Sequence, residues 1–136
     1  MAVSQRRKAP REIVMFIYPD AHLLDISGPM ALFAAANDFA GYRAYEVSLA
    51  AASLGNVPTS AGISLAATRR IGRVIAGIDT LLVAGGIGID AQLTAPRVIG
   101  WLQRQAPHCR RVASVCSGAL LLAKAGLLDG RRATTH

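Results

Sequence analysis

The sequence contains no hydrophobic run long enough to cross a membrane. A spanning helix needs about 20 consecutive apolar residues, whereas the first apolar run extends only from Ile13 to Tyr18. Basic residues precede this run, as they do in an export signal, but the run is too short for a signal core and ends at Pro19. We therefore expect a cytoplasmic protein that makes no membrane contact.

Cysteine is also scarce. The two cysteines, Cys109 and Cys116, are too few for the disulfide framework of a small secreted protein. Neither is accompanied by the paired Cys or His ligands of a zinc site. We expect both thiols to be free, and we expect neither a metal nor a cofactor.

Acidic residues are few: 8 stand against 15 basic residues, which gives a net charge of +7. Four of the basic residues lie within positions 1–11, where no aromatic residue interleaves with them. That composition is typical of a solvated tail rather than of a nucleic-acid-binding segment. The 136 residues are 52% hydrophobic, enough to bury one core. We predict a tail at 1–11 and one domain at 12–136.

Short apolar runs alternate with segments of helical periodicity, which indicates a parallel sheet covered by helices. The predicted strands are 13–18, 45–50, 80–84 and 112–115, with a small hairpin formed by 57–59 and 63–66. The predicted helices are 28–39, 70–76, 96–105 and the segment from Cys116 to residue 125. Ligand sites in such sheets lie beyond the carboxyl ends of the strands, so the loops 18–28 and 85–88 and Cys116 are candidates.

Cys116 follows an apolar strand and precedes Ser117, Gly118 and a helical segment. A strand, a tight turn and a helix in this order form a nucleophile elbow, in which the side chain stands clear of the sheet. The amides at the helix N-terminus stabilise a thiolate there, and Gly118 leaves room for the backbone. The alternative is an inert cysteine buried at the junction.

Asp25 lies just before the predicted helix 28–39. It could cap the N-terminus of that helix, or it could face Cys116 and share a proton with the sulfur or position a water. Its neighbours Asp20 and His22 are expected to be exposed turn residues. We expect the terminal His136 to be frayed.

Gly85 and Gly86 follow a predicted strand, but their spacing from Gly88 does not match a dinucleotide-binding fingerprint. Their amides could stabilise an oxyanion opposite the thiol, or the pair could simply form a tight turn. His108 and Cys109 lie at the other end of the sheet from Cys116, and we expect them to be structural or exposed.

Four segments together resemble the ThiJ/PfpI superfamily, which is related to class I glutamine amidotransferase domains. The resemblance covers about residues 12–136, and it is carried by Leu23–Pro29, Leu82–Gly86, Ala113–Ala119 and Ala125–His136. Within the superfamily the sequence is most similar to the N-terminal domain of GlxA-like AraC-type transcription regulators. Isonitrile hydratases form a neighbouring branch with the same aspartate and cysteine motifs.

The resemblance implies an α/β fold, a flavodoxin-like three-layer sandwich with a mostly parallel sheet. It implies that Cys116 occupies the nucleophile position and that Asp25 occupies the acidic position, which is glutamate in other branches. Protease-like members place histidine directly after the cysteine, and amidotransferases need a downstream His–Glu pair; this chain has neither, so both functions are disfavoured. The resemblance also implies a ligand pocket lined by Gly85, Gly86, Ser117 and Gly118.

Family domains continue past a Thr-Thr-His segment such as 134–136, so we expect a C-terminally incomplete domain whose open sheet edge favours a homodimer. The first candidate function is a small-molecule-sensing domain of an AraC-family regulator, with DNA bound only by a domain absent from this chain. The second is a cysteine-dependent hydratase of the isonitrile hydratase type that acts on a small electrophile. The third is a redox sensor in which Cys116 is oxidised.

Overall fold

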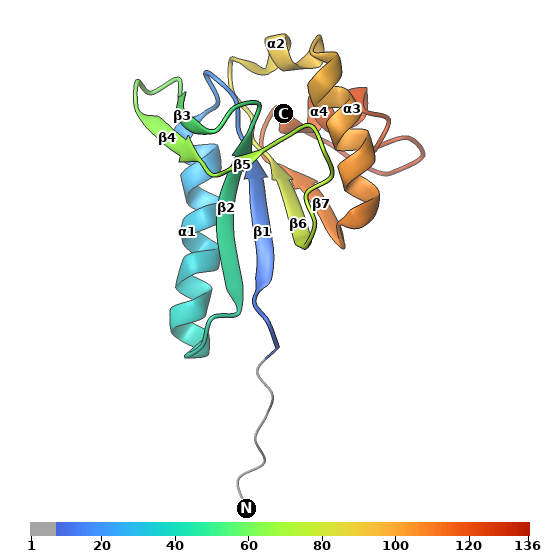
Figure 1. Cartoon of the computed structure of the whole chain (residues 1–136). Coiled ribbons are helices and arrows are strands. Elements are labelled where there is room, and N and C mark those ends of the chain that lie inside the picture. The colour runs from blue at the N-terminus through green and yellow to red at the C-terminus, as the bar shows by residue number, and fades with distance from the viewer. Residues whose placement is uncertain (1–7) are drawn as a thin grey trace, which may run out of the picture.

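A computed structural model describes residues 8–136 of the chain (Figure 1). Residues 1–7, which form most of the predicted basic tail, lie outside the described residues. The first strand begins at Arg11, one residue before the predicted start of the domain. The predicted α/β architecture is confirmed.

A five-stranded parallel sheet forms the centre of the molecule, in the strand order β5-β2-β1-β6-β7. Its strands are β1 (Arg11–Phe16), β2 (Tyr45–Ala51), β5 (Arg69–Arg70), β6 (Ile78–Val83) and β7 (Arg111–Ser114). The predicted hairpin is present as the antiparallel pair β3 (Gly55–Pro58) and β4 (Ser64–Ala67).

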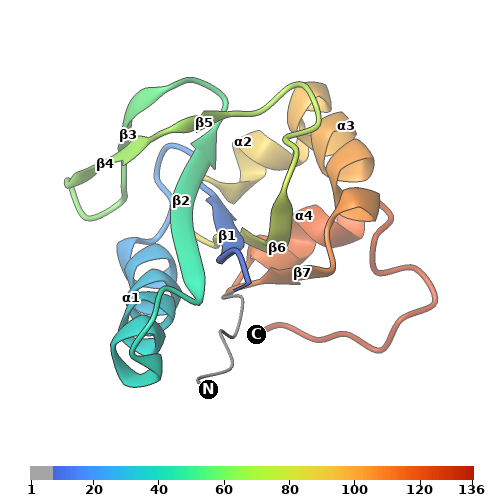
Figure 2. The same cartoon turned by 60° about the horizontal axis from the view of Figure 1, so that its bottom comes forward.

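Helices cover both faces of the sheet. They are α1 (Leu23–Ala40), α2 (Ile89–Leu93), α3 (Pro96–Gln105), the short 3-10 helix η1 (Ala106–His108) and α4 (Gly118–Lys124). Figure 2 shows α1 on one side of the sheet and α3 and α4 on the other. Among residues 8–136, no helix combines the length and the hydrophobicity that crossing a membrane requires.

The central strand β1 explains why the run from Ile13 to Tyr18 is apolar throughout. Its residues Ile13 to Phe16 are fully buried, because helices lie over both faces of a strand at the centre of a parallel sheet. The helix α3 packs against this strand with the predicted face, on which Val98, Trp101 and Leu102 are buried. The ring of Trp101 lies 5.7 Å from that of Phe16, centroid to centroid.

The helix predicted at 70–76 is wrong. Its first residue, Arg70, ends the short strand β5, and the rest of the segment forms bends and a turn that ends at Gly77. Gly72 and Gly77 both have positive φ, which interrupts a helix. The backbone of the segment is held by α3 instead: Arg97 donates to the carbonyl of Ile71, and the Trp101 indole donates to the carbonyl of Arg73.

Two helix boundaries also differ from prediction. The helix α1 begins at Leu23 rather than at Gly28, so Pro29 lies inside it instead of at its start. Pro29 lacks the amide that would donate to the carbonyl of Asp25, so the helix has one hydrogen bond fewer. The apolar contacts of α1 with the core stabilise the helix despite this missing bond. The short α2 was not predicted; it fills the loop between Gly88 and α3.

Candidate functional site

Cys116 stands between the end of β7 and the start of α4, as the sequence predicted. Its φ is +51°, a left-handed conformation that costs free energy for any residue with a Cβ. The turn is fixed on both sides, since the amide of Val115 donates to the carbonyl of Val83 and that of Gly118 to the carbonyl of Val115. The backbone therefore holds the half-buried thiol in one position at the carboxyl edge of the sheet.

His136 contacts this thiol. Its Nε2 lies 2.6 Å from Sγ of Cys116. The hydroxyl of the preceding Thr135 donates to the Cys116 carbonyl at 2.9 Å, so two successive residues are attached to the same turn. In Figure 1 the C-terminus lies toward the same end of the molecule as the carboxyl ends of the strands. The expectation that His136 is frayed is therefore wrong.

Asp25 lies in the first turn of α1. The capping alternative fails, because the N-cap residue of α1 is His22 and no side-chain hydrogen bond caps this helix. Instead, Oδ1 of Asp25 lies 3.2 Å from Nδ1 of His22. The other carboxyl oxygen, Oδ2, is buried without a hydrogen-bond partner among the described residues. A buried carboxyl oxygen without a partner is costly, so this one is available to a ligand or a water.

Gly85 brings Asp25 and Cys116 together. A Cβ added to Gly85 would lie 2.7 Å from Cβ of Cys116, 2.8 Å from Oδ2 of Asp25 and 2.8 Å from the amide nitrogen of Ser117. The carboxyl oxygen and the cysteine Cβ are thus at most 5.5 Å apart, the sum of the first two distances. Asp25 and Cys116, which the sequence allowed to face each other, therefore both border the small space next to the Cα of Gly85.

The remaining predicted pocket residues support the site rather than opening into it. The amide of Gly86 donates to Oγ of Ser117 at 3.0 Å, so this amide already has an acceptor. Gly118 is buried, and a Cβ there would collide with the backbone carbonyls of Val83 and Ala84. Glycine at 118 therefore lets α4 begin directly against β6, which determines where the cysteine stands.

Tyr18 was not predicted to belong to the site. Its hydroxyl donates to the carbonyl of Ala84 at 2.8 Å. Burial raises the pKa of the Tyr18 phenol far above its usual value, and the negative charges of Asp25 and Cys116 raise it further. The Tyr18 phenol consequently stays protonated and uncharged next to Asp25 and Cys116.

Several residues lie where the sequence placed them. Asp20 and His22 are exposed, although His22 also contacts Asp25. His108 is exposed, and Cys109 is half-buried with its sulfur 3.5 Å from the carbonyl of Gln105. Burial raises the pKa of the Cys109 thiol, which disfavours the reactive thiolate form.

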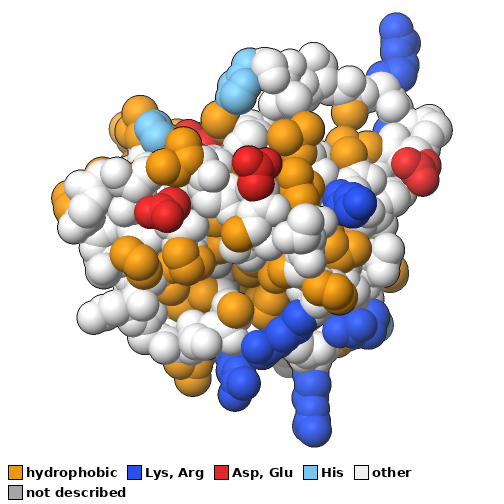
Figure 3. Space-filling model, turned by 90° about the horizontal axis from the view of Figure 1, so that it is seen from above, with side chains coloured by type: hydrophobic (Ala, Val, Ile, Leu, Met, Phe, Trp, Pro, Cys, Tyr) orange, Lys and Arg blue, Asp and Glu red, His pale blue; other side chains and the backbone are white. Residues whose placement is uncertain are grey.

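The view onto the carboxyl ends of the strands shows separate acidic and histidine side chains over an apolar and uncharged surface, with Lys and Arg gathered toward the rim (Figure 3). Within residues 8–136, no cluster of three His, Cys, Asp or Glu side chains is arranged to hold a metal ion. The candidate site at this edge comprises the Cys116 thiol, the Asp25 carboxylate and the imidazoles of His22 and His136.

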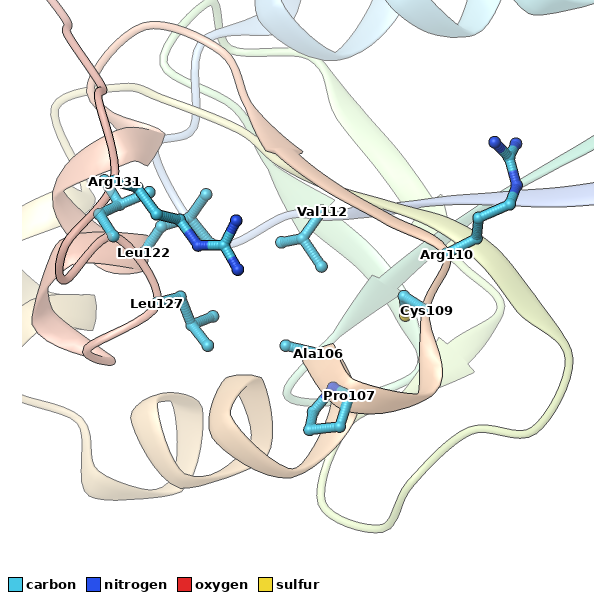
Figure 4. Close-up of a pocket in the computed structure, with 9 residues that line it drawn as sticks. Ala106, Pro107, Cys109, Arg110, Val112, Leu122, Leu127 and Arg131 are labelled. Carbon is cyan, nitrogen blue, oxygen red and sulfur yellow. The ribbon is translucent and has the colours of Figure 1, made fainter.

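A separate pocket of about 370 Å³ lies between the end of α3, β7 and the turn after α4 (Figure 4). Cys109, Val112, Leu122 and Leu127 line it, and Arg131 reaches across it, while Arg110 points away. None of the residues around Cys116 lines this pocket. We do not assign the site to it, because it lacks the carboxylate and the accessible thiol.

Residues 11–136 match the DJ-1/PfpI family. This chain belongs to the DJ-1/PfpI family. The expected ThiJ/PfpI relationship is thereby confirmed. The contact between His136 and Cys116 in this DJ-1/PfpI domain was missed, because no local spacing in the sequence brings residue 136 to the thiol.

Curated relatives include a protein without an assigned function, an enzyme and a regulator. The uncharacterized protein in the cpoL 5′ region of Streptomyces lividans is 39% identical over 127 residues, covering 93% of this chain and 88% of that protein. The isonitrile hydratase of Pseudomonas putida is 33% identical, covering 92% of this chain and 52% of the hydratase. The HTH-type transcriptional regulator GbdR of Pseudomonas aeruginosa is 28% identical, covering 98% of this chain and 36% of the regulator.

Solved structures confirm the fold. The crystal structure of a ThiJ/PfpI family protein from Pseudomonas syringae superposes with a TM-score of 0.75 at 26% identity, covering 88% of this chain and 47% of that chain. An AraC family transcriptional regulator from Pseudomonas putida has a TM-score of 0.71 at 19% identity, covering 90% and 64%. This DJ-1/PfpI chain thus spans about half to two thirds of both.

Proposed function

We propose that this domain senses a small molecule for an AraC-type transcription regulator whose DNA-binding part lies outside this sequence. The observation that carries the proposal is the shared space of Asp25, Cys116 and Gly85, in which one carboxyl oxygen has no partner among the described residues. A site of this kind recognises a small ligand by a hydrogen bond to Asp25 and by contact with the thiol. The relatedness to GbdR supports the regulatory role.

A thermal-shift screen of small polar metabolites against the purified chain tests this function. A ligand at 100 times its Kd adds about 2.7 kcal/mol to the free energy of unfolding, which corresponds to a rise in Tm of about 8–10 °C for a domain of this size. The rise should be lost in Asp25→Asn and retained in Cys109→Ser, which changes the thiol far from the site. If ligands raise Tm equally in wild type and Asp25→Asn, Asp25 does not form the ligand site.

A second candidate function is an enzyme of the isonitrile hydratase type, favoured by the contact between Cys116 and His136. The Cys116 sulfur would form a bond to the isonitrile carbon, and the thiol proton, held by His136, would move to that carbon. Water deprotonated by Asp25 would then add to the resulting thioimidate carbon while the nitrogen takes a proton. Breaking the C–S bond would restore the thiol and release the N-substituted formamide, so isonitrile and water account for every atom of the product.

Turnover distinguishes the two functions. An alkyl isonitrile incubated with the chain should yield its formamide only if Cys116 acts as a nucleophile, with the Cys109→Ser variant as the matched control. The sensing function predicts binding without formamide. Formamide production that disappears in Cys116→Ser and persists in Cys109→Ser would replace the sensing function with the enzymatic one.

The third candidate, oxidation of Cys116 in a redox sensor, is tested in the same samples. Mass spectrometry after peroxide treatment would show oxygen on Cys116 before Cys109, because only the thiolate reacts and burial keeps Cys109 protonated. Equal oxidation of both cysteines would argue against a sensor at this site.

A further inference from the structure

Four arginines gather where the segment that joins β5 to β6 runs alongside α3 (Figure 2). Arg70 ends β5, Arg73 lies in the joining segment, and Arg97 and Arg104 belong to α3. All four residues are exposed. Arg97 and Arg104 are about two helical turns apart, so they lie on the same face of α3. We call these four residues the arginine surface.

The guanidinium groups of Arg97 and Arg104 converge on two successive residues of the joining segment. Nη2 of Arg97 donates to the carbonyl of Ile71 at 2.9 Å, and Nη2 of Arg104 donates to the carbonyl of Gly72 at 3.0 Å. A Cβ at Gly72 would lie 3.5 Å from Nη2 of Arg97, so this guanidinium rests close over the glycine backbone. A guanidinium has five N–H donors, so both groups are held in place with most of their donors left for an external acceptor.

Among residues 8–136, no carboxylate forms an ion pair with the arginine surface. All eight acidic residues of the chain lie in this described range, and the ion pairs there involve other basic residues: Arg11, His22, Arg43, Arg69 and Arg110. Arg69 shows the contrast, because it is next to Arg70 in the chain and pairs with Glu12. Uncompensated positive charges on adjoining segments create a positive potential that attracts anions.

The composition of the surface favours a chain of phosphates over a protein or a membrane. Among the large apolar side chains that are exposed, only Val74 lies in residues 69–77 or in α3. Protein–protein interfaces have an apolar and often aromatic centre from which charged residues are depleted, and binding at a membrane surface needs apolar side chains to insert. Protein–DNA interfaces are more polar and more positively charged, and a planar guanidinium matches two phosphate oxygens at once.

We propose that the arginine surface binds the phosphate backbone of duplex DNA. Contacts to phosphates carry no sequence information by themselves, so the binding is independent of base sequence. The sequence predicted DNA binding only through a domain outside this chain, and this contact adds to that binding. It involves neither Asp25 nor Cys116, so it can fail while the sensing function holds, and the reverse.

A tether to a separate DNA-binding part would make a weak contact effective, a consequence that rests on the proposed function. Such a part would hold the arginine surface near the duplex, where the effective concentration of a site on a short linker is on the order of millimolar. Contacts too weak to hold the isolated domain on DNA would then fix its orientation on the duplex.

The salt dependence of binding measures how many phosphates are contacted. Each phosphate that a cationic side chain neutralises contributes about −0.9 to the slope of log K against log[salt]. If each of the four arginines contacts one phosphate, the surface contributes about −3.6 to this slope. The dissociation constant should then rise about twelvefold for each doubling of the salt concentration.

Fluorescence anisotropy of a labelled duplex of mixed sequence, about 20 base pairs long, tests the proposal at several KCl concentrations. The double variant Arg97→Gln/Arg104→Gln should raise the dissociation constant at least about tenfold near 50 mM KCl and reduce the size of the slope by about 1.8. The matched control is Lys124→Gln/Arg132→Gln, which removes the same charge from the end of α4 and the turn after it. This control should bind like wild type, and the basic tail 1–11 is the same in all these proteins.

A second double variant separates DNA binding from stability, because Arg97→Gln/Arg104→Gln also removes two hydrogen bonds to the backbone. The side chains of Arg70 and Arg73 form no hydrogen bond or ion pair within residues 8–136. Arg70→Gln/Arg73→Gln should therefore unfold at the wild-type urea concentration and still reduce the slope by about 1.8. Ligand-induced rises in Tm, which test the sensing function, should be the same in this variant as in wild type.

Three results would overturn the proposal. The first is duplex binding that neither arginine double variant weakens. The second is a control variant that weakens binding as much as the arginine double variants do. The third is binding of polyglutamate, or of vesicles that contain anionic lipid, as tight as binding of the duplex, because the surface would then suit an acidic protein or a membrane equally well.

Discussion

Replacing Gly85 with alanine should destabilise the protein and disturb Cys116 at the same time. The φ of Gly85 lies outside the left-handed range, so alanine can adopt the backbone conformation without strain. The whole effect must then come from the space that the new methyl group enters. That space is bounded by Cβ of Cys116, the amide nitrogen of Ser117 and Oδ2 of Asp25.

The magnitude follows from the distances. The methyl carbon would lie 2.7 Å from Cβ of Cys116, and it must move out by about 0.7 Å to reach the 3.4 Å at which ordinary contact begins. The carboxylate of Asp25 can rotate away. The other two atoms belong to or adjoin the backbone of a turn held by hydrogen bonds, so they cannot rotate aside. Overpacking of this kind costs about 1–3 kcal/mol of the free energy of unfolding.

Urea unfolding monitored by circular dichroism measures this loss, and Gly28→Ala is the matched control. Nothing lies within 4 Å of a Cβ at Gly28, which is inside the helix α1. Alanine there should stabilise the chain by about 0.5–1 kcal/mol, since glycine is a poor helix former. The same substitution should therefore have opposite signs at the two sites.

The chemical effect is measured by alkylating the free thiols with iodoacetamide and following each cysteine by mass spectrometry. In Gly85→Ala the rate at Cys116 should change at least severalfold, while the rate at Cys109, at the other end of the sheet, should not. If Gly85→Ala is as stable as wild type and Cys116 reacts at the wild-type rate, the close packing of Gly85, Asp25 and Cys116 does not exist.

Three further substitutions test other parts of the structure. Tyr18→Phe should lower the free energy of unfolding by about 0.5–1.5 kcal/mol, because it removes a buried hydrogen bond to the main chain. Burial raises the pKa of Tyr18, so the folded state favours the protonated phenol. Wild type should therefore lose this contribution to stability as the pH rises above 10, and the variant should not. The hydrogen bonds from Arg110 lower the pKa of Asp79 below 3.8, so the advantage of wild type over Asp79→Asn in urea midpoint should be full at pH 6 and should disappear as the pH falls below 3.8. Gln105→Leu should cost about 1–3 kcal/mol in urea unfolding, because the buried amide bonds both to the N–H and to the C=O of Ile75; a loss below 0.5 kcal/mol would show that water replaces these bonds.

The sheet could be predicted from sequence because burial on both faces leaves a simple pattern. The run from Ile13 to Tyr18 is apolar throughout for this reason, and α3 was found at its observed limits because its buried face repeats with helical spacing. Local pattern failed where distant side chains decide the structure. The segment 70–76 has helical composition, but Trp101 and Gln105 bind its backbone in another conformation.

The candidate site was likewise predicted only in part from the sequence. Cys116 and Asp25 were found because each follows a recognisable local pattern, and the structure brings them within 5.5 Å through Gly85. Tyr18 was missed because an aromatic residue at the end of a buried strand looks like ordinary core. The contact of His136 depends on the path of the last residues back over the sheet, which no local spacing indicates.

The single tryptophan of the chain has a practical consequence for following the protein in solution. Trp101 is completely buried, packs on Phe16 of the central strand and donates its indole N–H to the carbonyl of Arg73. Its fluorescence therefore arises from one environment, at the contact between α3 and the sheet. An emission maximum at short wavelength that moves to the red would report the separation of α3 from β1, on the side of the sheet away from α1. The one intrinsic fluorophore of the chain therefore reports whether the core between α3 and β1 is intact.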